Sequence, residues 1–129
     1  MPLIKIDIIE GRSETEIRAL LDTTHRAMVD AFQVPERDRY QILSEHRENR
    51  MIVEDTGLGI ARTNKVVVIS VTSRPRTEAD KVKFYQLLAQ SLEENCGIKP
   101  TDLIVSIATN TDSDWSFGHG RAQFLTGEL

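Results

Sequence analysis

The feature that most constrains the fold of this 129-residue chain is an internal repeat, because its second half presents the same order of structural signals as its first. Residues 3–9 (LIKIDII) alternate in character and are rich in isoleucine, while residues 66–72 (VVVISVT) form a β-branched run. Both patterns are typical of strands, and the second is typical of a strand buried on both faces. We therefore expect each half to open with a strand.

A helix signal follows each of these strands. Ser13 and Thr77 each have an acid three residues later, Glu16 and Asp80, which is the arrangement of an amino-terminal capping box. Residues suited to a buried face then recur at helical spacing. In the first half they are Ile17, Leu20, Leu21, Thr24, Ala27, Met28, Ala31 and Phe32, and in the second, more loosely, Val82, Tyr85, Leu88, Ala89, Leu92 and Cys96. We expect two helices, each with one face towards a sheet.

Each expected helix ends in a similar phrase that leads into a second strand. The phrases are residues 34–38 (VPERD) and 98–102 (IKPTD), followed by the strand-like residues 40–43 (YQIL) and 103–108 (LIVSIA). The repeat length is therefore about 64 residues. A strand, a helix and a second strand in so short a span imply a parallel, right-handed crossover.

Two such units predict one α+β domain over residues 1–129, with an internal duplication at about 2–60 and 65–129. The expected architecture is a four-stranded sheet with two helices on one face. Residues 51–54 (MIVE) and the tail from Asp112 have no counterparts of equal length, and we expect short accessory strands or hairpins there. Because the second face of such a sheet has no cover, self-association is the simplest way to bury it.

The composition of the chain argues against two classes of binding partner, nucleic acid and membrane. The net charge of −4 supplies no basic footprint for nucleic acid or anionic lipid. No segment reaches the roughly 20 apolar residues that span a bilayer. The amino-terminal sequence is interrupted by the acidic residue Asp7 and lacks the apolar run of a signal peptide. The single cysteine, Cys96, cannot form an internal disulfide. We expect a cytoplasmic protein that binds neither nucleic acid nor membrane.

The common catalytic constellations are missing, so we expect no metal and no cofactor. His25, His46 and His119 lack ligand spacing with one another and with Cys96, which is more consistent with a small core residue. The glycine pairs at 57–59 and 118–120 lack the third glycine of a dinucleotide-binding loop, and Ser116 has no nucleophile elbow around it.

What remains is Pro2 directly after Met1, Asp38, the run at 73–77 (SRPRT) and the aromatic tail. With two strand-helix-strand repeats, this set resembles the tautomerase superfamily, whose members carry a catalytic amino-terminal proline and usually assemble as trimers. The resemblance is closest to the malonate semialdehyde decarboxylase branch. It runs the whole length of the chain, through the motifs VPERDRYQ, EDTGLG, SRPRTE and DWSFGHGRAQFLTG. It implies the tautomerase (MIF-like) fold and a homotrimer.

The resemblance also implies a site for a small carboxylate-bearing substrate. Its catalytic residues are Pro2, Asp38, Arg74 and Arg76. Its substrate-binding residues are Arg74 and Arg76, with an apolar wall of Trp115, Phe117, Phe124 and Leu129. Between the two phenylalanines the chain has His119 where the pattern leads us to expect arginine, so no anion-binding role is implied for that loop.

Pro2 has a chemical role only if Met1 is removed. The resulting secondary amine could attack an aldehyde to form an iminium ion or, when protonated, polarise the carbonyl oxygen. Arg74 and Arg76 would lower the pKa of that amine and Asp38 would raise it; the resemblance points to the cation. Alternatively, Pro2 simply starts an edge strand, where a missing N–H has no cost.

The other polar residues have structural alternatives too. Arg74 and Arg76 lie between a strand and a capped helix start, where an arginine fork can hold a carboxylate, but they could also be solvated. Asp38 could reach Pro2 if the first two strands are neighbours, but it could instead be a turn residue like Asp102. The tail aromatics could be core or trimer contacts.

The resemblance implies loss of carbon dioxide from malonate semialdehyde, leaving acetaldehyde. The alternatives are a hydratase or keto-enol tautomerase of the same superfamily, acting on a phenylpyruvate-type or unsaturated 2-oxo acid with the same residues. A further alternative is a non-enzymatic trimeric signalling or scaffold protein, in which Pro2 is incidental.

Overall fold

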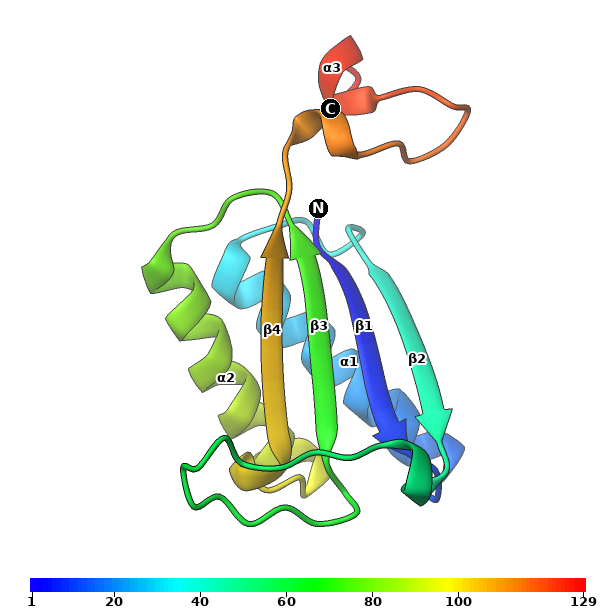
Figure 1. Ribbon diagram of the computed structural model, residues 1–129. Coiled ribbons are helices and arrows are strands. Elements are labelled where there is room, and N and C mark those ends of the chain that lie inside the picture. Colours follow the sequence, from blue (N-terminus) through cyan, green and yellow to red (C-terminus); the bar gives the residue numbers. More distant parts are fainter.

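The computed structural model describes residues 1–129 and contains the two expected strand-helix-strand units (Figure 1). The first unit consists of β1 (Leu3–Ile9), α1 (Glu14–Phe32) and β2 (Tyr40–His46), and the second of β3 (Val67–Ser73), α2 (Glu78–Cys96) and β4 (Leu103–Thr109). The short helices are the 3-10 turns η1 (Glu48–Arg50), η2 (Pro100–Asp102) and η3 (Asp112–Asp114), and α3 (Gln123–Thr126). The α+β class and the two strand-helix-strand units are confirmed.

The four strands form one mixed sheet in the order β2-β1-β3-β4. Strands are parallel within each unit, whereas β1 and β3 pair antiparallel, with Leu3 opposite Thr72. The two units therefore run in opposite directions. One end of the sheet, which we call the Pro2 end, carries the starts of β1 and β2 and the ends of β3 and β4. The opposite end, which we call the Asp102 end, carries the starts of β3 and β4.

Both long helices pack on one face of the sheet (Figure 1). Alternate residues of β1 and β3 face them and are almost fully buried: Ile4, Ile6, Ile8, Val67, Ile69 and Val71. They meet a helix layer that includes Leu20, Met28, Phe84, Leu88 and Leu92. This burial of large aliphatic and aromatic side chains supplies the main stabilisation of the fold.

Capping fixes where the helices begin and end. The Ser13 hydroxyl accepts a hydrogen bond from the Glu16 backbone N–H while the Glu16 carboxylate accepts one from the Ser13 N–H, so the predicted capping box is complete at α1. At α2, the Thr77 hydroxyl caps the Asp80 N–H. Both helices end on a left-handed residue, Gln33 at φ 52° and Gly97 at φ 65°.

The expected accessory strands are absent, and this prediction was wrong. Residues 51–54 lie in a loop that crosses the Asp102 end of the sheet instead of running along its edge (Figure 1), so no strand is available to pair with them. The loop is held instead by side chains: Arg62 donates to the carbonyls of Glu54 and Thr101. The tail from Asp112 likewise contains η3, turns and α3, with no hairpin.

The sheet face opposite the helices has no second layer within the chain (Figure 1). Tyr40 and Ile42 of the edge strand β2 are 41% and 51% exposed on this face, beside Leu3 and Lys5 of β1. The tail continues beyond the Pro2 end of the sheet, so α3 lies outside the two-layer body. No helix in the chain has both the length and the apolar character needed to cross a membrane.

Candidate active site

The amino terminus lies at the Pro2 end of the sheet, beside the end of β3 (Figure 1). Pro2 is buried directly before β1. Burial, followed by the positive charges of Arg74 and Arg76, lowers the pKa of the Met1 amine to about 6, whereas Asp38 is among the groups that raise it. The amine at the start of the chain therefore senses all three of the other predicted catalytic residues.

This pKa shift bears on the charge expected for the amine. Burial disfavours the cation, and two arginines in the neighbourhood add repulsion. Only Asp38 and Asp112 act in the opposite direction. For Met1, one residue before Pro2, the surroundings thus favour the neutral amine near pH 7, which is opposite to the cationic form that the family resemblance implies for Pro2.

Arg76 is held rigidly between β3 and α1. Its Nε donates to the Ser73 hydroxyl at 3.1 Å and its Nη1 to the Phe32 carbonyl at 3.4 Å, and its guanidinium carbon lies 5.2 Å from the centre of the Phe32 ring. Ser73 is fully buried. Burial, with a smaller effect from Arg74, lowers the pKa of Arg76. Two contacts to fixed groups leave its second terminal nitrogen, Nη2, without a protein partner.

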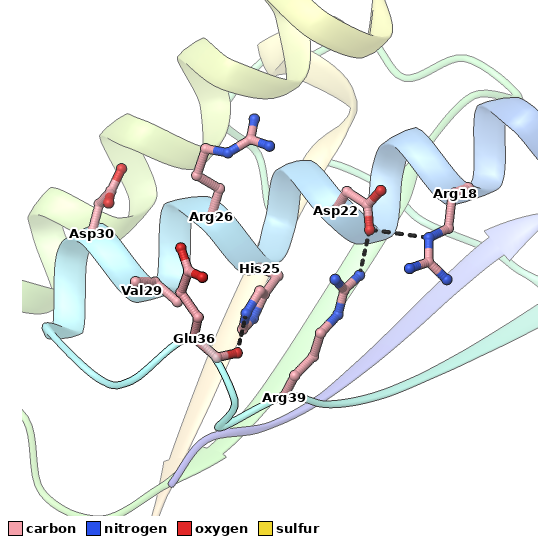
Figure 2. A pocket seen from close by; sticks show the side chains of 8 residues that line it. All are labelled: Arg18, Asp22, His25, Arg26, Val29, Asp30, Glu36 and Arg39. Carbon is pink, nitrogen blue, oxygen red and sulfur yellow. Dashed lines mark hydrogen bonds and ion pairs between the residues drawn. The ribbon is translucent and has the colours of Figure 1, made fainter.

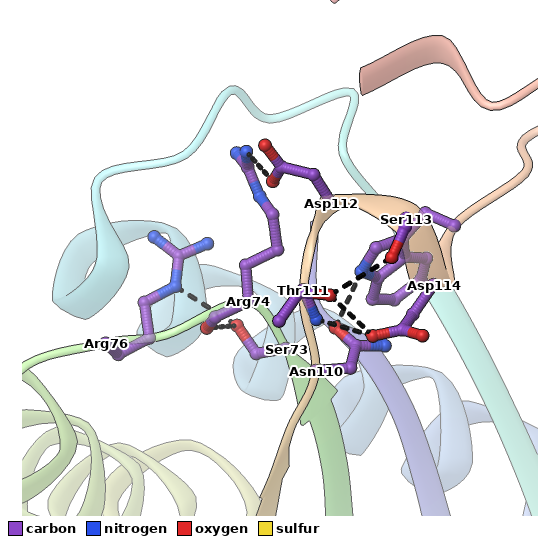
Figure 3. A network of polar contacts seen from close by, with 9 residues as sticks. Ser73, Arg74, Arg76, Asn110, Thr111, Asp112, Ser113 and Asp114 are labelled. Atoms are coloured by element: carbon purple, nitrogen blue, oxygen red, sulfur yellow. Dashed lines mark hydrogen bonds and ion pairs between the residues drawn. The ribbon is translucent and has the colours of Figure 1, made fainter. Parts of the chain in front are cut away.

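Arg74 connects the body to the tail (Figure 3). Its Nη1 donates to Asp112 at 3.0 Å, and its guanidinium carbon lies 3.8 Å from the centre of the Phe124 ring. Its Nε is buried and has no hydrogen-bond partner. Since a buried unpaired donor is costly, this N–H is a natural position for an acceptor on a bound molecule.

Asp38 is 7% exposed, and its carboxylate makes no hydrogen bond within the chain. Its backbone N–H donates to the Pro35 carbonyl at 3.0 Å, so the main chain makes the turn without help from the side chain. Its charge acts on both the amino terminus and Arg76. A turn aspartate commonly accepts hydrogen bonds from nearby backbone N–H groups, whereas this carboxylate accepts none and is open to a bound partner.

The aromatic residues of the tail form one cluster. Trp115 stacks on Phe117 with ring centres 5.3 Å apart, and Phe117 meets the edge of Phe124 at 5.5 Å. Tyr40 packs on Phe117 at 5.7 Å. The contact between Phe124 and Arg74 brings this cluster to the charged residues. Leu129, by contrast, is 58% exposed and is anchored only through a backbone hydrogen bond to Gln123.

Three contributors to this region were not anticipated from the sequence. Ser73 orients Arg76, Tyr40 extends the aromatic cluster, and Asp112 pairs with Arg74 and affects the amine. Ser73 and Tyr40 could have been found from their places beside the arginine pair and at the start of a strand. Nothing in the local sequence distinguishes Asp112 from its neighbour Asp114, which only closes a turn with Thr111.

The Pro2 end is an open surface in the single chain. None of the three cavities in the structure includes Pro2, Arg74 or Arg76. The largest, of about 390 Å³, lies between α1 and the loop before β2, and is described below. A substrate at the Pro2 end would therefore be incompletely enclosed by one chain.

Comparison with known proteins identifies the family. Two family models, both described as "Tautomerase enzyme", match residues 2–61 and 38–118 and together include Pro2, Asp38, Arg74 and Arg76. The chain belongs to the tautomerase family. It is 60% identical over 129 residues, all of both chains, to "Probable tautomerase YrdN" of Bacillus subtilis (strain 168). It is also 32% identical to "Probable tautomerase YusQ" of the same organism, over 97% of this chain and 99% of that one.

Solved structures support an enzyme of this family. A crystal structure of malonate semialdehyde decarboxylase superposes with a TM-score of 0.96 at 56% identity, over 98% of each chain. A second, FG41 malonate semialdehyde decarboxylase inhibited by 3-bromopropiolate, superposes at 0.94 with 41% identity, over 98% of this chain and 97% of that one. A fused 4-OT symmetric trimer, at 22% identity and a TM-score of 0.79 over 97% and 98%, shares the fold.

Proposed function

We propose that the protein is a decarboxylase that converts malonate semialdehyde to acetaldehyde and carbon dioxide. The observation that carries the proposal is the meeting of the amino terminus with Asp38, Arg74 and Arg76 at one end of the sheet. The 56% identity to a malonate semialdehyde decarboxylase over nearly the whole chain supports this choice of substrate. The reaction needs no cofactor, because the substrate's own carbonyl group accepts the electrons.

Pro2 is the proposed reactive group once Met1 has been removed. In the covalent route, the neutral amine attacks the aldehyde carbon, a C–N bond forms and water leaves, giving an iminium ion. The bond to the carboxylate carbon then breaks, and its electron pair neutralises the iminium to an enamine. Protonation at carbon and hydrolysis release acetaldehyde. In the non-covalent route, a cationic Pro2 donates a hydrogen bond to the carbonyl oxygen and stabilises the enolate.

The two arginines are the proposed carboxylate ligands. Arg76 presents its free nitrogen from a side chain fixed by Ser73 and Phe32, and Arg74 has an unpaired buried N–H. Held by such a pair, the carboxylate can be oriented with the breaking C–C bond perpendicular to the carbonyl plane, where its electrons overlap the acceptor. Asp38 is the proposed group that balances the charge of the amine and guides a proton.

The aromatic cluster is the proposed apolar wall. Trp115, Phe117 and Phe124 offer little solvation to a carboxylate, which favours its conversion to neutral carbon dioxide. Leu129 is assigned to the same wall, where an exposed residue at the end of the tail can be covered by a second copy. We propose a homotrimer in which neighbouring copies cover the open sheet face and complete the site; the fused 4-OT structure that shares this fold is a symmetric trimer. The cytoplasmic location stays a prediction.

The direct test is an assay of the Met1-processed protein, verified by mass spectrometry. Incubation with malonate semialdehyde should release carbon dioxide and give acetaldehyde, which alcohol dehydrogenase detects by NADH oxidation. Phenylpyruvate tautomerisation is assayed in parallel. Borohydride added during turnover should reduce any iminium and leave a stable adduct on Pro2. Turnover without an adduct favours the cationic route, and absence of carbon dioxide release contradicts the proposal.

Hydration is the second candidate activity. The matched decarboxylase at 56% identity is described as having both decarboxylase and hydratase activities. Asp38 could activate water while a protonated Pro2 delivers a proton to carbon. Addition of water to an unsaturated or acetylenic acid, without carbon dioxide release from malonate semialdehyde, would favour this candidate.

A further inference from the structure

His25 is a buried titratable group that the proposed mechanism does not use. It lies in the middle of α1 and is only 9% exposed. Its Nε2 is 2.7 Å from the backbone carbonyl oxygen of Glu36 (Figure 2). Because a carbonyl can only accept, Nε2 must carry the hydrogen of this bond. The other ring nitrogen, Nδ1, is buried without a hydrogen-bond partner.

The bonded carbonyl belongs to the loop that carries Asp38. Glu36 is two residues before Asp38, and Arg39 directly follows Asp38. Arg39 is also hydrogen-bonded to α1. Its Nη2 donates to Asp22 at 2.7 Å, and its Nε donates to Gln41 at 2.8 Å. The loop is therefore attached to α1 on both sides of Asp38: through His25 before it and through Asp22 after it.

Packing gives this loop little support on the helix side. A cavity of about 390 Å³ separates the loop from α1, and its lining is almost entirely polar. The lining residues are Arg18, Asp22, His25, Arg26, Val29, Asp30, Glu36 and Arg39 (Figure 2). Val34, at the start of the loop, packs against the core. Glu36 and Arg39, in contrast, line the cavity and contact α1 through hydrogen bonds, so these bonds hold the part of the loop around Asp38.

We propose that His25 is a positioning residue for Asp38: its Nε2–H holds the Glu36 carbonyl and thereby fixes the distance between the Asp38 carboxylate and the amine at the start of the chain. The inference rests on the proposed role of Asp38 and adds the group that places it. The Asp38 carboxylate makes no hydrogen bond within the chain, so the position of its side chain depends on the main chain that carries it.

Two amide variants separate the hydrogen bond from the volume of the ring. The terminal nitrogen of His25→Gln reaches about as far as Nε2, whereas that of His25→Asn ends near the position of Nδ1. We expect His25→Gln to keep kcat within about three-fold, and His25→Asn to lower kcat by about ten-fold to a hundred-fold with little change in KM, as misplacement of a catalytic group does. Arg26→Gln is the control, because Arg26 lines the same cavity without bonding the loop.

A double-mutant cycle tests the connection to Asp38. If His25 acts through Asp38, then His25→Asn adds little to the loss already caused by Asp38→Asn. Multiplicative losses would show an independent effect and overturn the proposal, as would equal losses in His25→Asn and His25→Gln. Urea unfolding of each variant shows whether the folded state is retained.

A measurement without substrate separates this inference from the proposed reaction. The pH dependence of acylation of the processed amino terminus reports the pKa of its amine. Both Asp38→Asn and His25→Asn should lower that pKa, because Asp38 is removed or moved away. If Asp38→Asn shifts the pKa and His25→Asn does not, the positioning role is wrong while Asp38 stays beside the amine. Loss of decarboxylation alone, with both shifts present, contradicts only the proposed function.

Discussion

Asp38 and Asp102 occupy the same position in the two halves of the repeat, yet the structure uses them differently. Both are buried and both precede a strand. Asp102 accepts hydrogen bonds from the backbone N–H of Thr63 at 2.7 Å and from the Thr63 hydroxyl, and so fixes the long loop to the Asp102 end of the sheet. Asp38 has no such partner, and its charge raises the pKa of the amine and opposes the lowering of the Arg76 pKa. One carboxylate fixes a loop, and the other makes no hydrogen bond within the chain.

The same comparison extends to the arginines. Arg12 and Arg76 both directly precede a helix N-cap, Ser13 or Thr77. Arg12 donates to the Lys65 carbonyl at 2.6 Å, at the Asp102 end of the sheet. At that end the residue equivalent to Pro2 in the repeat is Val66, which lies within the chain and has no free amine. The duplication thus produces two similar ends, and only the Pro2 end can gain an amino-terminal nucleophile.

The largest difference is expected between Pro2 and Val66. Pro2→Ala should lower kcat/KM for decarboxylation by about a hundred-fold to ten-thousand-fold, the range of a lost acid, base or nucleophile. Val66→Ala, at a site 2% exposed, should keep kcat/KM and lower the free energy of unfolding by about 1–3 kcal/mol. Steady-state kinetics and urea unfolding measure the two effects. Full decarboxylase activity in Pro2→Ala would show that another group is the reactive one.

The arginine pair comes next. Arg76→Ala should lower kcat/KM by about ten-fold to a hundred-fold, mainly through KM, because about 1.5–3 kcal/mol of charged hydrogen bonding to the substrate is lost. Arg12→Ala should leave kcat/KM within about two-fold, as expected for a side chain that only bonds a loop carbonyl. Equal losses in the two variants would mean that both arginines act through the fold.

Substitution of Asp102 should change stability but not activity, and substitution of Asp38 should change activity but not stability. Asp102→Asn should lower the free energy of unfolding by about 1–3 kcal/mol through weaker bonds to Thr63, with kcat unchanged. Asp38→Asn should lower kcat without loss of stability, because the carboxylate makes no hydrogen bond within the chain that the amide would weaken.

Asp38→Asn should also move the pH–rate profile. Asp38 raises the pKa of the amine at the start of the chain, so its removal lowers that pKa. If the neutral amine is active, the acid limb shifts to lower pH; if the cation is active, the alkaline limb shifts to lower pH. Arg76→Ala should shift the same limb upward, since Arg76 lowers the pKa. A limb that stays in place in both variants would show that it belongs to another group.

The smallest effect is expected at the helix ends. Gln33 and Gly97 close α1 and α2 in the same left-handed conformation, which costs more for a residue with a side chain. Gln33→Gly should raise the free energy of unfolding by up to about 1 kcal/mol, and Gly97→Ala should lower it by about 1 kcal/mol. A Cβ at position 97 meets no atom within 4 Å, so backbone strain is the only expected cost. Urea midpoints at unchanged m-values provide the measurement.

Much of the fold could be predicted because its signals are local. The β-branched runs, the helical stripes and the caps at Ser13 and Thr77 are each set within a few residues, and the corresponding elements are confirmed. Residues 51–54 failed as a strand because a strand needs a partner, and the sequence of one segment does not reveal whether a sheet edge lies beside it.

The candidate site was harder to predict from the sequence than the fold. Arg74 and Arg76 stood out as a pair before a helix cap, but Asp112 did not, because it reaches Arg74 only through the path of the tail after β4. Asp38 and Asp102 were also indistinguishable by position in the repeat. What separates them is the presence of Thr63 beside one of them and of the chain's amino terminus beside the other.

By itself, therefore, the sequence determined two strand-helix-strand units, since periodicity and capping act over a few residues. Only the tertiary structure decided that the units run in opposite directions, through the antiparallel pairing of β1 with β3. That pairing sets the end of β3 beside the start of β1, and so brings Arg74 and Arg76 from one unit to Pro2 and Asp38 of the other. Had the two strands paired parallel, the arginines would lie at the opposite end of the sheet from the amine.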